Sequence, residues 1–254
     1  VFDRSRGAPL MWGRLLFAGL LFVTAAPAEA QRVIADLSSK EIAISTGFTG
    51  AELLLFGATE GYGDIVVTVV GPHREEIVRR KERVAGIWVN GASVIFKRTP
   101  AYYRVAASRT LEDIAPPALL RSLQIGTGTI RPDTVSSHPE DVTQEFREAL
   151  IRNKQHLDLY GEGVSEIRIV GGRLFRTNIP FPANVPTGEY LVTVYLFNDG
   201  RLISQEQTPL AVHKVGLEAQ IFTFAYEQSH WYGAIAILVA LVAGWLAGVI
   251  FRRA

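Results

Sequence analysis

One uncharged stretch near the C-terminus constrains this chain most. Residues Trp231–Phe251 carry no charged side chain and are followed directly by Arg252-Arg253. A hydrocarbon core about 30 Å thick is crossed by roughly 20 helical residues, each rising about 1.5 Å. The stretch therefore predicts a transmembrane helix over 231–251, and we expect everything before it to be tethered to a membrane. The alternative is a buried helix of a large soluble core.

The N-terminal segment has the parts of an export signal in the expected order. Arg14 precedes a short apolar run, Leu15–Ala26, which leads to Pro27-Ala28-Glu29-Ala30. A basic region, an apolar region and an A-x-A site are typical of a secretory signal peptide. We expect residues 1–30 to be removed by cleavage after Ala30. The alternative is an uncleaved N-terminal anchor, for which the apolar run is short.

The two apolar segments together predict the topology. After cleavage the N-terminus lies outside the bilayer, and Arg252-Arg253 marks the cytoplasmic side because cytoplasmic flanks favour Lys and Arg. We expect the bulk of the chain in the periplasm, one span in the bacterial inner membrane (N-out, C-in) and a cytoplasmic tail at 252–254. Leu217, Ile221 and Phe224 recur at helical spacing, which predicts a juxtamembrane helix over 213–230.

Small residues repeat along one face of the expected span. The residues at every fourth position are Ala236, Ala240, Gly244 and Gly248. Small side chains let two membrane helices approach closely. The stripe predicts packing on another membrane protein or on a second copy of this chain, although Gly and Ala are common in membrane helices generally.

Composition removes several classes of function. The formal net charge is +1 and there is no cysteine, so no global positive field attracts nucleic acid, and disulfides, thiolate nucleophiles and Cys-ligated metals are excluded. None of the five histidines (His73, His138, His156, His213 and His230) lies at the spacing of a helical metal pair. We assign no catalytic, metal or cofactor-binding residue and expect no cofactor.

The exported region predicts a mainly β fold. Short alternating or β-branched runs, separated by Gly, Asp and Asn, occupy both of its halves. In the second half, Gly171-Gly172 and Asn198-Asp199-Gly200 predict turns between such runs. We expect an immunoglobulin-like antiparallel β-sandwich over 31–212, in which Tyr190 is placed as a corner tyrosine. A helical segment at about 110–162 interrupts it, with short turns after Thr110 and an amphipathic helix from Pro139 to Gly161. Two small β domains are the alternative.

Two features of the first half are open to more than one interpretation. His73–Arg83 is nearly all charged and is either a solvated edge strand or a basic patch for lipid headgroups or an anionic partner. Asn90-Gly91 predicts a tight hairpin turn between 86–89 and 92–97. Trp88, Tyr102 and Tyr103 are either core packing, together with Phe96, or an aromatic recognition face.

The run GIWVNGASVIFKRTPAYYRVAASRTL (Gly86–Leu111) resembles the signature of an uncharacterised alphaproteobacterial family of single-pass transmembrane proteins. The matching positions are Gly86, Trp88, Val89, Asn90, Phe96, Pro100, Tyr102, Tyr103, Ser108 and Arg109. The order of signal peptide, β-rich exported region and C-terminal span also agrees. The resemblance carries no assigned function, and it implies a sulfite-exporter-type permease as a membrane partner.

These observations favour a non-enzymatic, membrane-anchored periplasmic protein that acts as an accessory or interaction subunit of a membrane complex. The alternative is a periplasmic binding module for a small ligand or an envelope polymer, using Trp88, Tyr102 and Tyr103. A membrane-anchored hydrolase has the least support, because the sequence shows no pair of groups with the separated pKa values that acid–base chemistry needs.

Overall fold

The computed structural model describes residues 32–135, 138–216 and 229–251. The chain divides into two compact units, residues 1–30 and 31–254. The first unit, with the expected signal peptide and its cleavage after Ala30, lies outside the described residues, as does the expected tail at 252–254.

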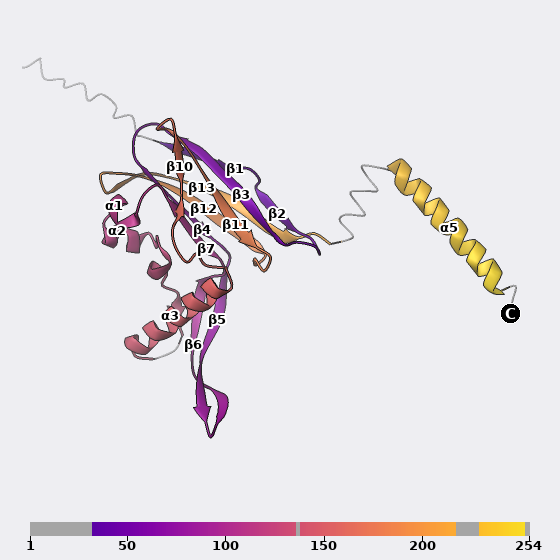
Figure 1. Ribbon diagram of the computed structural model, residues 1–254, viewed down its shortest axis with the longest axis horizontal. Coiled ribbons are helices and arrows are strands. Elements are labelled where there is room, and N and C mark those ends of the chain that lie inside the picture. Colours follow the sequence, from indigo (N-terminus) through magenta and orange to yellow (C-terminus); the bar gives the residue numbers. More distant parts are fainter. Residues whose placement is uncertain (1–31, 136–137, 217–228, 252–254) are drawn as a thin grey trace, which may run out of the picture. The chain divides into compact units, whose positions relative to one another are not determined.

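The described region is mainly β, as the sequence predicts, and its strands form three sheets (Figure 1). Sheet A has the order β1 (Val33–Leu37), β3 (Gly50–Thr59), β11 (Leu174–Pro182) and β10 (Arg168–Val170). Sheet B has the order β2 (Glu41–Ile44), β13 (Arg201–Lys214), β12 (Gly188–Asn198), β4 (Asp64–Val70), β7 (Tyr103–Ala107) and β9 (Ser165–Glu166). Sheet C has the order β5 (His73–Val84), β6 (Ile87–Pro100) and β8 (Asp133–Thr134).

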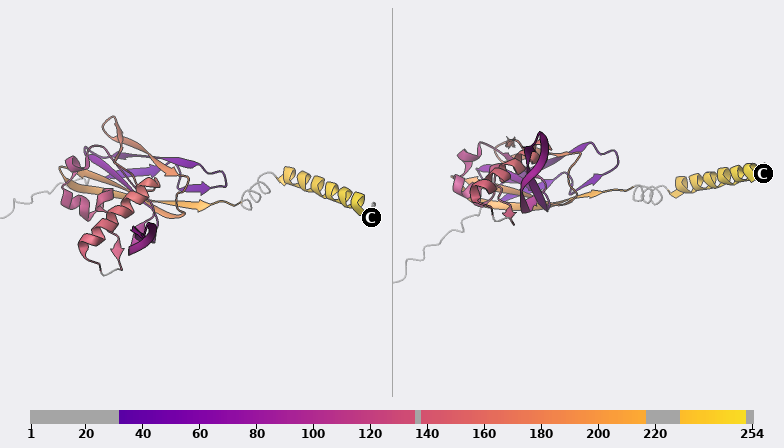
Figure 2. Two further views of the ribbon diagram at one scale, coloured as in Figure 1. Left: turned by 60° about the horizontal axis from the view of Figure 1, so that its bottom comes forward. Right: turned by 90° about the horizontal axis from the view of Figure 1, so that it is seen from below.

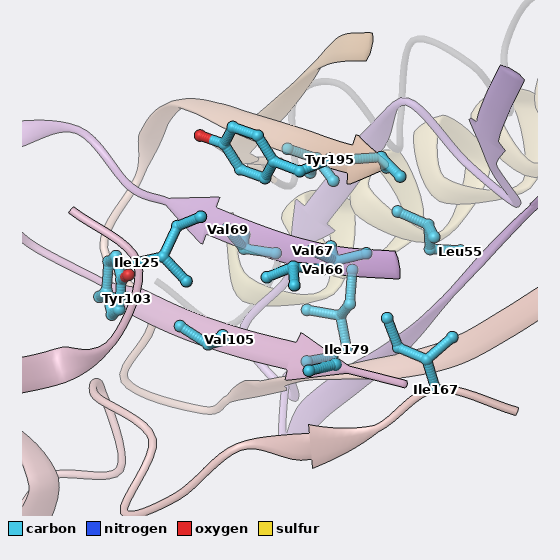
Figure 3. Packing of buried hydrophobic residues seen from close by; sticks show 14 of the residues in the cluster. Leu55, Val66, Val67, Val69, Tyr103, Val105, Ile125, Ile167, Ile179 and Tyr195 are labelled. Carbon is cyan, nitrogen blue, oxygen red and sulfur yellow. The ribbon is translucent and has the colours of Figure 1, made fainter. Parts of the chain in front are cut away.

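Sheets A and B share one hydrophobic core. Leu55 and Ile179 of sheet A lie in the same buried cluster as Val66 and Val67 of sheet B (Figure 3). Strands from the two halves of the chain are direct neighbours, since β3 pairs with β11 and β4 pairs with β12. Neither half could therefore bury its apolar face without the other.

A helical segment covers the second face of sheet B. It consists of α1 (Leu111–Ile114), α2 (Pro117–Ser122) and the 3₁₀ turn η1 (Thr127–Thr129), and its buried side chains join the core cluster. Strand β4 is buried along most of its length, as expected of a β-branched run that is covered on both faces. Thr110 is followed by Asp113 at the spacing of a capping box, but its side chain makes no capping bond to α1.

The long hairpin of sheet C corrects a predicted turn. β5 and β6 meet at Ala85-Gly86, both with positive φ (50° and 85°), and β6 continues without a break through Asn90-Gly91. Asn90 instead lies opposite Lys81 in the ladder. Two-residue hairpin loops need positive φ at both central positions, and here an Ala-Gly pair supplies them. The charged stretch that begins at His73 is an edge strand, as one of its two interpretations predicts.

Helix α3 (Glu140–His156) packs on the base of this hairpin (Figure 2). A separate small cluster, called here the hairpin core, contains Val78, Val94, Phe96, Phe146 and Leu150. The Lys154 ammonium adds an ion pair with Glu76 of β5. The amphipathic helix is thus confirmed, although it ends at His156 rather than at Gly161.

Two turns and one tyrosine follow the sequence rules. β10 and β11 are joined at Gly171-Gly172, and β12 and β13 at Asp199-Gly200, all with positive φ. The Tyr190 hydroxyl donates to the carbonyl of Pro186, four residues upstream (2.6 Å). That bond has the geometry of a tyrosine corner.

The C-terminal segment is described in part. β13 extends to Lys214, so residues 213 and 214 are strand, and the rest of the expected juxtamembrane helix lies largely outside the described residues. Helix α5 runs over Ser229–Phe251, where the span is expected. Across the described residues, no helix combines the length and apolar character needed to cross a membrane. The transmembrane assignment of 231–251 therefore stays a prediction.

Candidate functional site

The outer face of sheet A is the large apolar surface that no described element covers. Strand pairing sets Ile34 opposite Ala58, Ala58 opposite Leu174, and Leu174 opposite Val170. These four residues form one row across all four strands, called here the apolar row. Ile34 is 62% exposed and Leu174 is 57% exposed. Contiguous exposed apolar residues on a domain mark an interaction site more often than isolated ones do.

A groove of about 600 Å³ follows this row. Its walls include the apolar row together with the rings of Phe56 and Phe175. Phe175 is buried, and its ring packs directly under Gly57 in the space that a side chain there would fill. The groove is therefore built from strand backbone and packed aromatic rings rather than from loops.

Charged residues form the next row of the same face. Asp36 lies opposite Phe56, Phe56 opposite Arg176, and Arg176 opposite Arg168. Within residues 32–135 and 138–216, neither arginine makes an ion pair with a carboxylate. Like charges directly opposite each other on paired strands are unfavourable, so an anionic group placed between the two guanidinium groups would relieve their repulsion.

A second, more polar hollow of about 560 Å³ adjoins the arginine pair. Ser165, Glu166 and Asn178 line it beside Arg168 and Arg176. The surface therefore offers apolar contact at one end and cationic hydrogen-bond donors at the other. It is suited to binding an apolar surface that carries acidic groups.

The structure does not bring the predicted recognition residues together. Trp88 is 66% exposed on the β5–β6 hairpin, whereas Tyr102 is 0% exposed and Tyr103 is 2% exposed. Tyr102 lies in the bend before β7, Tyr103 is the first residue of that strand, and both are buried, so neither can line an exposed surface. Tyr102 stacks on Phe181 between the sheets, and Tyr103 packs beneath the helical segment beside Ile125 (Figure 3).

Both tyrosine hydroxyls are occupied. Tyr102 donates to the carbonyl of Pro180, and Tyr103 donates to the carbonyl of Gln124 (2.6 Å) and accepts from the amide of Gly126 (3.0 Å). Burial raises the pKa of both phenols well above the ordinary tyrosine value. These contacts are those of core residues that satisfy their polar tips.

Ser108 and Arg109, two positions of the sequence signature, hold the start of β4. Arg109 makes a bidentate contact with the Asp64 carboxylate, and the Ser108 hydroxyl donates to the same group (3.1 Å). The hydrogen bonds from Arg109 keep the pKa of Asp64 below its usual value. The group joins the ends of β4 and β7 and has a structural role.

Among the described residues, no three His, Asp or Glu side chains gather closely enough to hold a metal ion. The hollow near Gly126-Thr127-Gly128 lies between η1 and α2 and measures about 400 Å³. It is lined largely by apolar residues of that segment. The outer face of sheet A therefore remains the best candidate site.

Residues 32–253 match a family model described as "Putative transmembrane protein (Alph_Pro_TM)". The chain belongs to this family. The family expected from the sequence is thereby confirmed, and the match includes both the facing sheets and helix α5. The description of the Alph_Pro_TM family gives no activity or partner.

No curated protein sequence matches this Alph_Pro_TM chain. Among solved structures, it is similar to the crystal structure of Spo0M, a sporulation control protein from Bacillus subtilis, with 10% identity and a TM-score of 0.30. The match covers 78% of this chain and 55% of Spo0M, so this chain spans about half of that protein. At that score the similarity supports no inference about fold or function.

The helix-packing residues expected in this Alph_Pro_TM chain all lie in α5. Ala240, Gly244 and Gly248 are exposed on that helix, and a Cβ atom at Gly244 or Gly248 would meet no atom within 4 Å. The side chain of Ala236 lies outside the described residues. Packing through this stripe therefore stays a prediction.

Sequence reasoning missed the outer face of sheet A, although β3 carries a signal for it. A strand with one solvated face alternates apolar and polar residues, but Leu53-Leu54-Leu55-Phe56 is apolar at four consecutive positions. Leu53 and Leu55 point into the core, and Leu54 and Phe56 point outward. The run therefore signals apolar side chains on both faces of this strand.

Proposed function

We propose that this protein is a non-enzymatic interaction subunit of a membrane complex, with its β region exported to the periplasm and anchored in the inner membrane by α5. The observation that carries the proposal is the exposed apolar row on sheet A, which lies beside Arg168 and Arg176, two side chains that form no ion pair with any carboxylate of the described residues. Membership of a family described as transmembrane supports the anchor. We propose an immunoglobulin-like sandwich for the two facing sheets, supported by the corner bond of Tyr190.

The proposed occupant of sheet A is an exported segment of another membrane protein that presents apolar side chains followed by acidic ones. Covering a side chain that is already about half buried recovers part of the roughly 1.5–3 kcal/mol that full burial provides. Ile34 and Leu174 would together contribute about 2 kcal/mol on that basis. Arg168 and Arg176 would select acidic residues, since guanidinium groups bind carboxylates in a bidentate manner.

The anchor contributes a second contact in this proposal. Ala236, Ala240, Gly244 and Gly248 would let α5 pack closely on a helix of the same partner or on a second copy. Two linked contacts raise the effective concentration of each, so each can be weak alone. A sulfite-exporter-type permease is the candidate partner that the sequence resemblance implies.

The experiment places a photo-crosslinking amino acid at Phe56, or at Tyr62 as an exposed control, in the full-length chain in native membranes. The expected result is a cross-link from position 56 to one membrane protein, through an apolar and acidic segment identified by mass spectrometry. Arg168→Glu with Arg176→Glu should abolish that cross-link while the chain remains folded. The loss would indicate that the arginine pair selects the partner.

Three outcomes would reject the docking proposal. The first is equal cross-linking from positions 56 and 62, and the second is a cross-link that survives the Arg168→Glu and Arg176→Glu changes. The third is a cross-link only to a second copy, which would make sheet A a self-association surface. Leu replacements at Gly244 and Gly248 test the anchor contact separately, because detergent-stable co-purification should weaken.

The groove itself favours one second candidate, a binding module for an anionic amphiphile. A volume of about 600 Å³ beside two arginines suits an acyl chain with an anionic headgroup. Binding of a fluorescent fatty acid to the purified chain, lost in the Arg168→Glu variant and in Leu174→Glu, would support this candidate. No binding at millimolar ligand would reject it.

A further inference from the structure

The distal half of the β5–β6 hairpin projects beyond its supporting helix (Figure 1). The hairpin core includes Val78 of β5 and Val94 of β6, but no residue nearer the turn. From Arg79 to Asn90 every side chain is exposed. This segment, residues 79–91, is called here the hairpin tip.

The hairpin tip is layered by polarity. At the turn, Val84 lies opposite Ile87, and neither Ala85 nor Gly86 adds a charge. The next layer sets Trp88 opposite Arg83. Ile87 is 70% exposed, and Trp88 is exposed to a similar degree. Exposed Trp and Ile at a projecting turn bury nothing within the described chain, so packing of the fold does not account for them.

From the Trp88 layer toward the base, the hairpin tip is basic. It holds Arg79, Arg80, Lys81 and Arg83 against a single acidic residue, Glu82. Arg80 forms an ion pair with Glu145 of α3. In the described part of the chain, Arg79, Lys81 and Arg83 form no ion pair with a carboxylate. Three cations are thus available to an anionic surface.

We propose that the hairpin tip inserts into the interface of a bilayer that contains anionic lipid. Strand residues advance about 3.4 Å each, so an insertion of about 5–10 Å, as typical of interfacial elements, would submerge the layers at the turn and that of Trp88. Lys81 and Arg79 would then lie level with the headgroups. Trp prefers this depth, and anionic lipid attracts nearby Lys and Arg.

Two arguments favour lipid over a protein partner. A stable protein interface needs about 800 Å² from each side, contributed by roughly 20–30 residues, whereas the hairpin tip is a narrow two-stranded ribbon. The unpaired backbone groups on its two edges also rule out a position in the hydrocarbon core and keep it at the interface. The inference concerns a site distinct from sheet A and does not depend on the docking proposal.

The test uses the absence of cysteine from the sequence. Ile87→Cys in the full-length chain is labelled with an environment-sensitive dye, and Tyr62→Cys is the matched control at another exposed loop. Each protein is reconstituted into vesicles of phosphatidylcholine with or without phosphatidylglycerol, with a quencher attached to the lipid chains. The dye at position 87 should be quenched strongly in the anionic vesicles, and the dye at position 62 should not.

The charge requirement is tested in the same vesicles. Each neutralisation among Arg79→Gln, Lys81→Gln and Arg83→Gln should lower the inserted-to-free ratio about fivefold, as expected for one cation near an anionic surface. Equal quenching at positions 87 and 62 would overturn the proposal. The proposal would also be overturned if the dye at position 87 were quenched as strongly in neutral vesicles as in anionic ones. The same holds if the three Gln replacements left its quenching unchanged.

Discussion

Replacement of Tyr102 by Phe separates the two roles that the sequence allows for the aromatic residues. The change keeps the ring, which stacks on Phe181 with centroids 5.1 Å apart, and removes only the hydroxyl. A hydrogen bond contributes about 1 kcal/mol net, and a buried acceptor left without its partner costs about 1–3 kcal/mol. We therefore expect Tyr102→Phe to lower the free energy of unfolding by about 2 kcal/mol.

Tyr103→Phe should lower the free energy of unfolding by more than Tyr102→Phe does. The Tyr103 hydroxyl bonds two backbone groups, the Gln124 carbonyl and the Gly126 amide. For a domain of 150–250 residues, 1 kcal/mol shifts Tm by about 2–4 °C. Tyr102→Phe should thus lower Tm by about 4–8 °C, and Tyr103→Phe by more. Trp88→Ala, at an exposed position, should change the free energy of unfolding by less than about 0.5 kcal/mol.

The assay is thermal unfolding of the full-length chain in detergent, followed by circular dichroism at the β-sheet band. The reasoning fails if Tyr102→Phe and Tyr103→Phe melt with the wild type. It fails equally if Trp88→Ala melts several degrees lower, because that result would place the indole in a packed environment. Trp88→Ala is thus the exposed control for the two buried tyrosine variants.

The remaining predictions concern charge, burial and close packing. Asp64→Asn should cost about 1–2 kcal/mol at pH 7, since it weakens the charged contact with Arg109. The lowered pKa of Asp64 means that its contribution is present above about pH 4 and is lost as the pH falls below that value. At the alkaline end, burial raises the pKa of Tyr102, Tyr103, Tyr160 and Tyr190, so stability should fall above about pH 10, by about 1.4 kcal/mol per pH unit for each. Gly57→Ala should cost about 1–3 kcal/mol, because its Cβ would lie 2.4 Å from the ring of Phe175.

Each of these has a direct check. The urea unfolding midpoints of wild type and Asp64→Asn should lie closer together at pH 3 than at pH 7. A difference between the two proteins that is the same at both pH values would contradict the acid prediction. Stability that is unchanged up to pH 12 would contradict the tyrosine prediction. Gly91→Ala is the control for Gly57→Ala, since the atoms nearest to its Cβ belong to the end of the exposed, flexible Glu82 side chain; equal losses in the two variants would contradict the packing argument.

The sequence predicted the turns where chemistry leaves little choice. Gly171-Gly172 and Asp199-Gly200 adopt positive φ as expected. Asn90-Gly91 carries the same local signal, but there the pairing of two long strands decides. Asn90 pairs with Lys81, whose ammonium donates to the Asn90 side chain (2.7 Å), and the register of the ladder shifts beside this pair instead of ending in a turn. A dipeptide such as Asn-Gly indicates only that a turn can form at that position. Where the turn does form depends on the register of both strands along their whole length.

The candidate site could not be predicted in the same way. Its apolar row takes one residue from each of four strands, from Ile34 near one end of the described chain to Leu174 far along it. No periodicity in one segment reports which strands become neighbours. The burial of Tyr102 and Tyr103 was within reach of the sequence, because core packing is one of the two roles that it allows for them.

The hairpin core has a consequence for how the molecule opens. Five residues form it, whereas the cluster between sheets A and B is several times larger. Local opening free energies follow the amount of buried apolar contact, so α3 and the β5–β6 hairpin that it packs on should detach as one cooperative unit while the two facing sheets stay closed. Hydrogen exchange would then show two classes of amide, with those of α3 exchanging earlier than those of β4 and β12. The hairpin can thus be repositioned at a cost well below that of unfolding the protein.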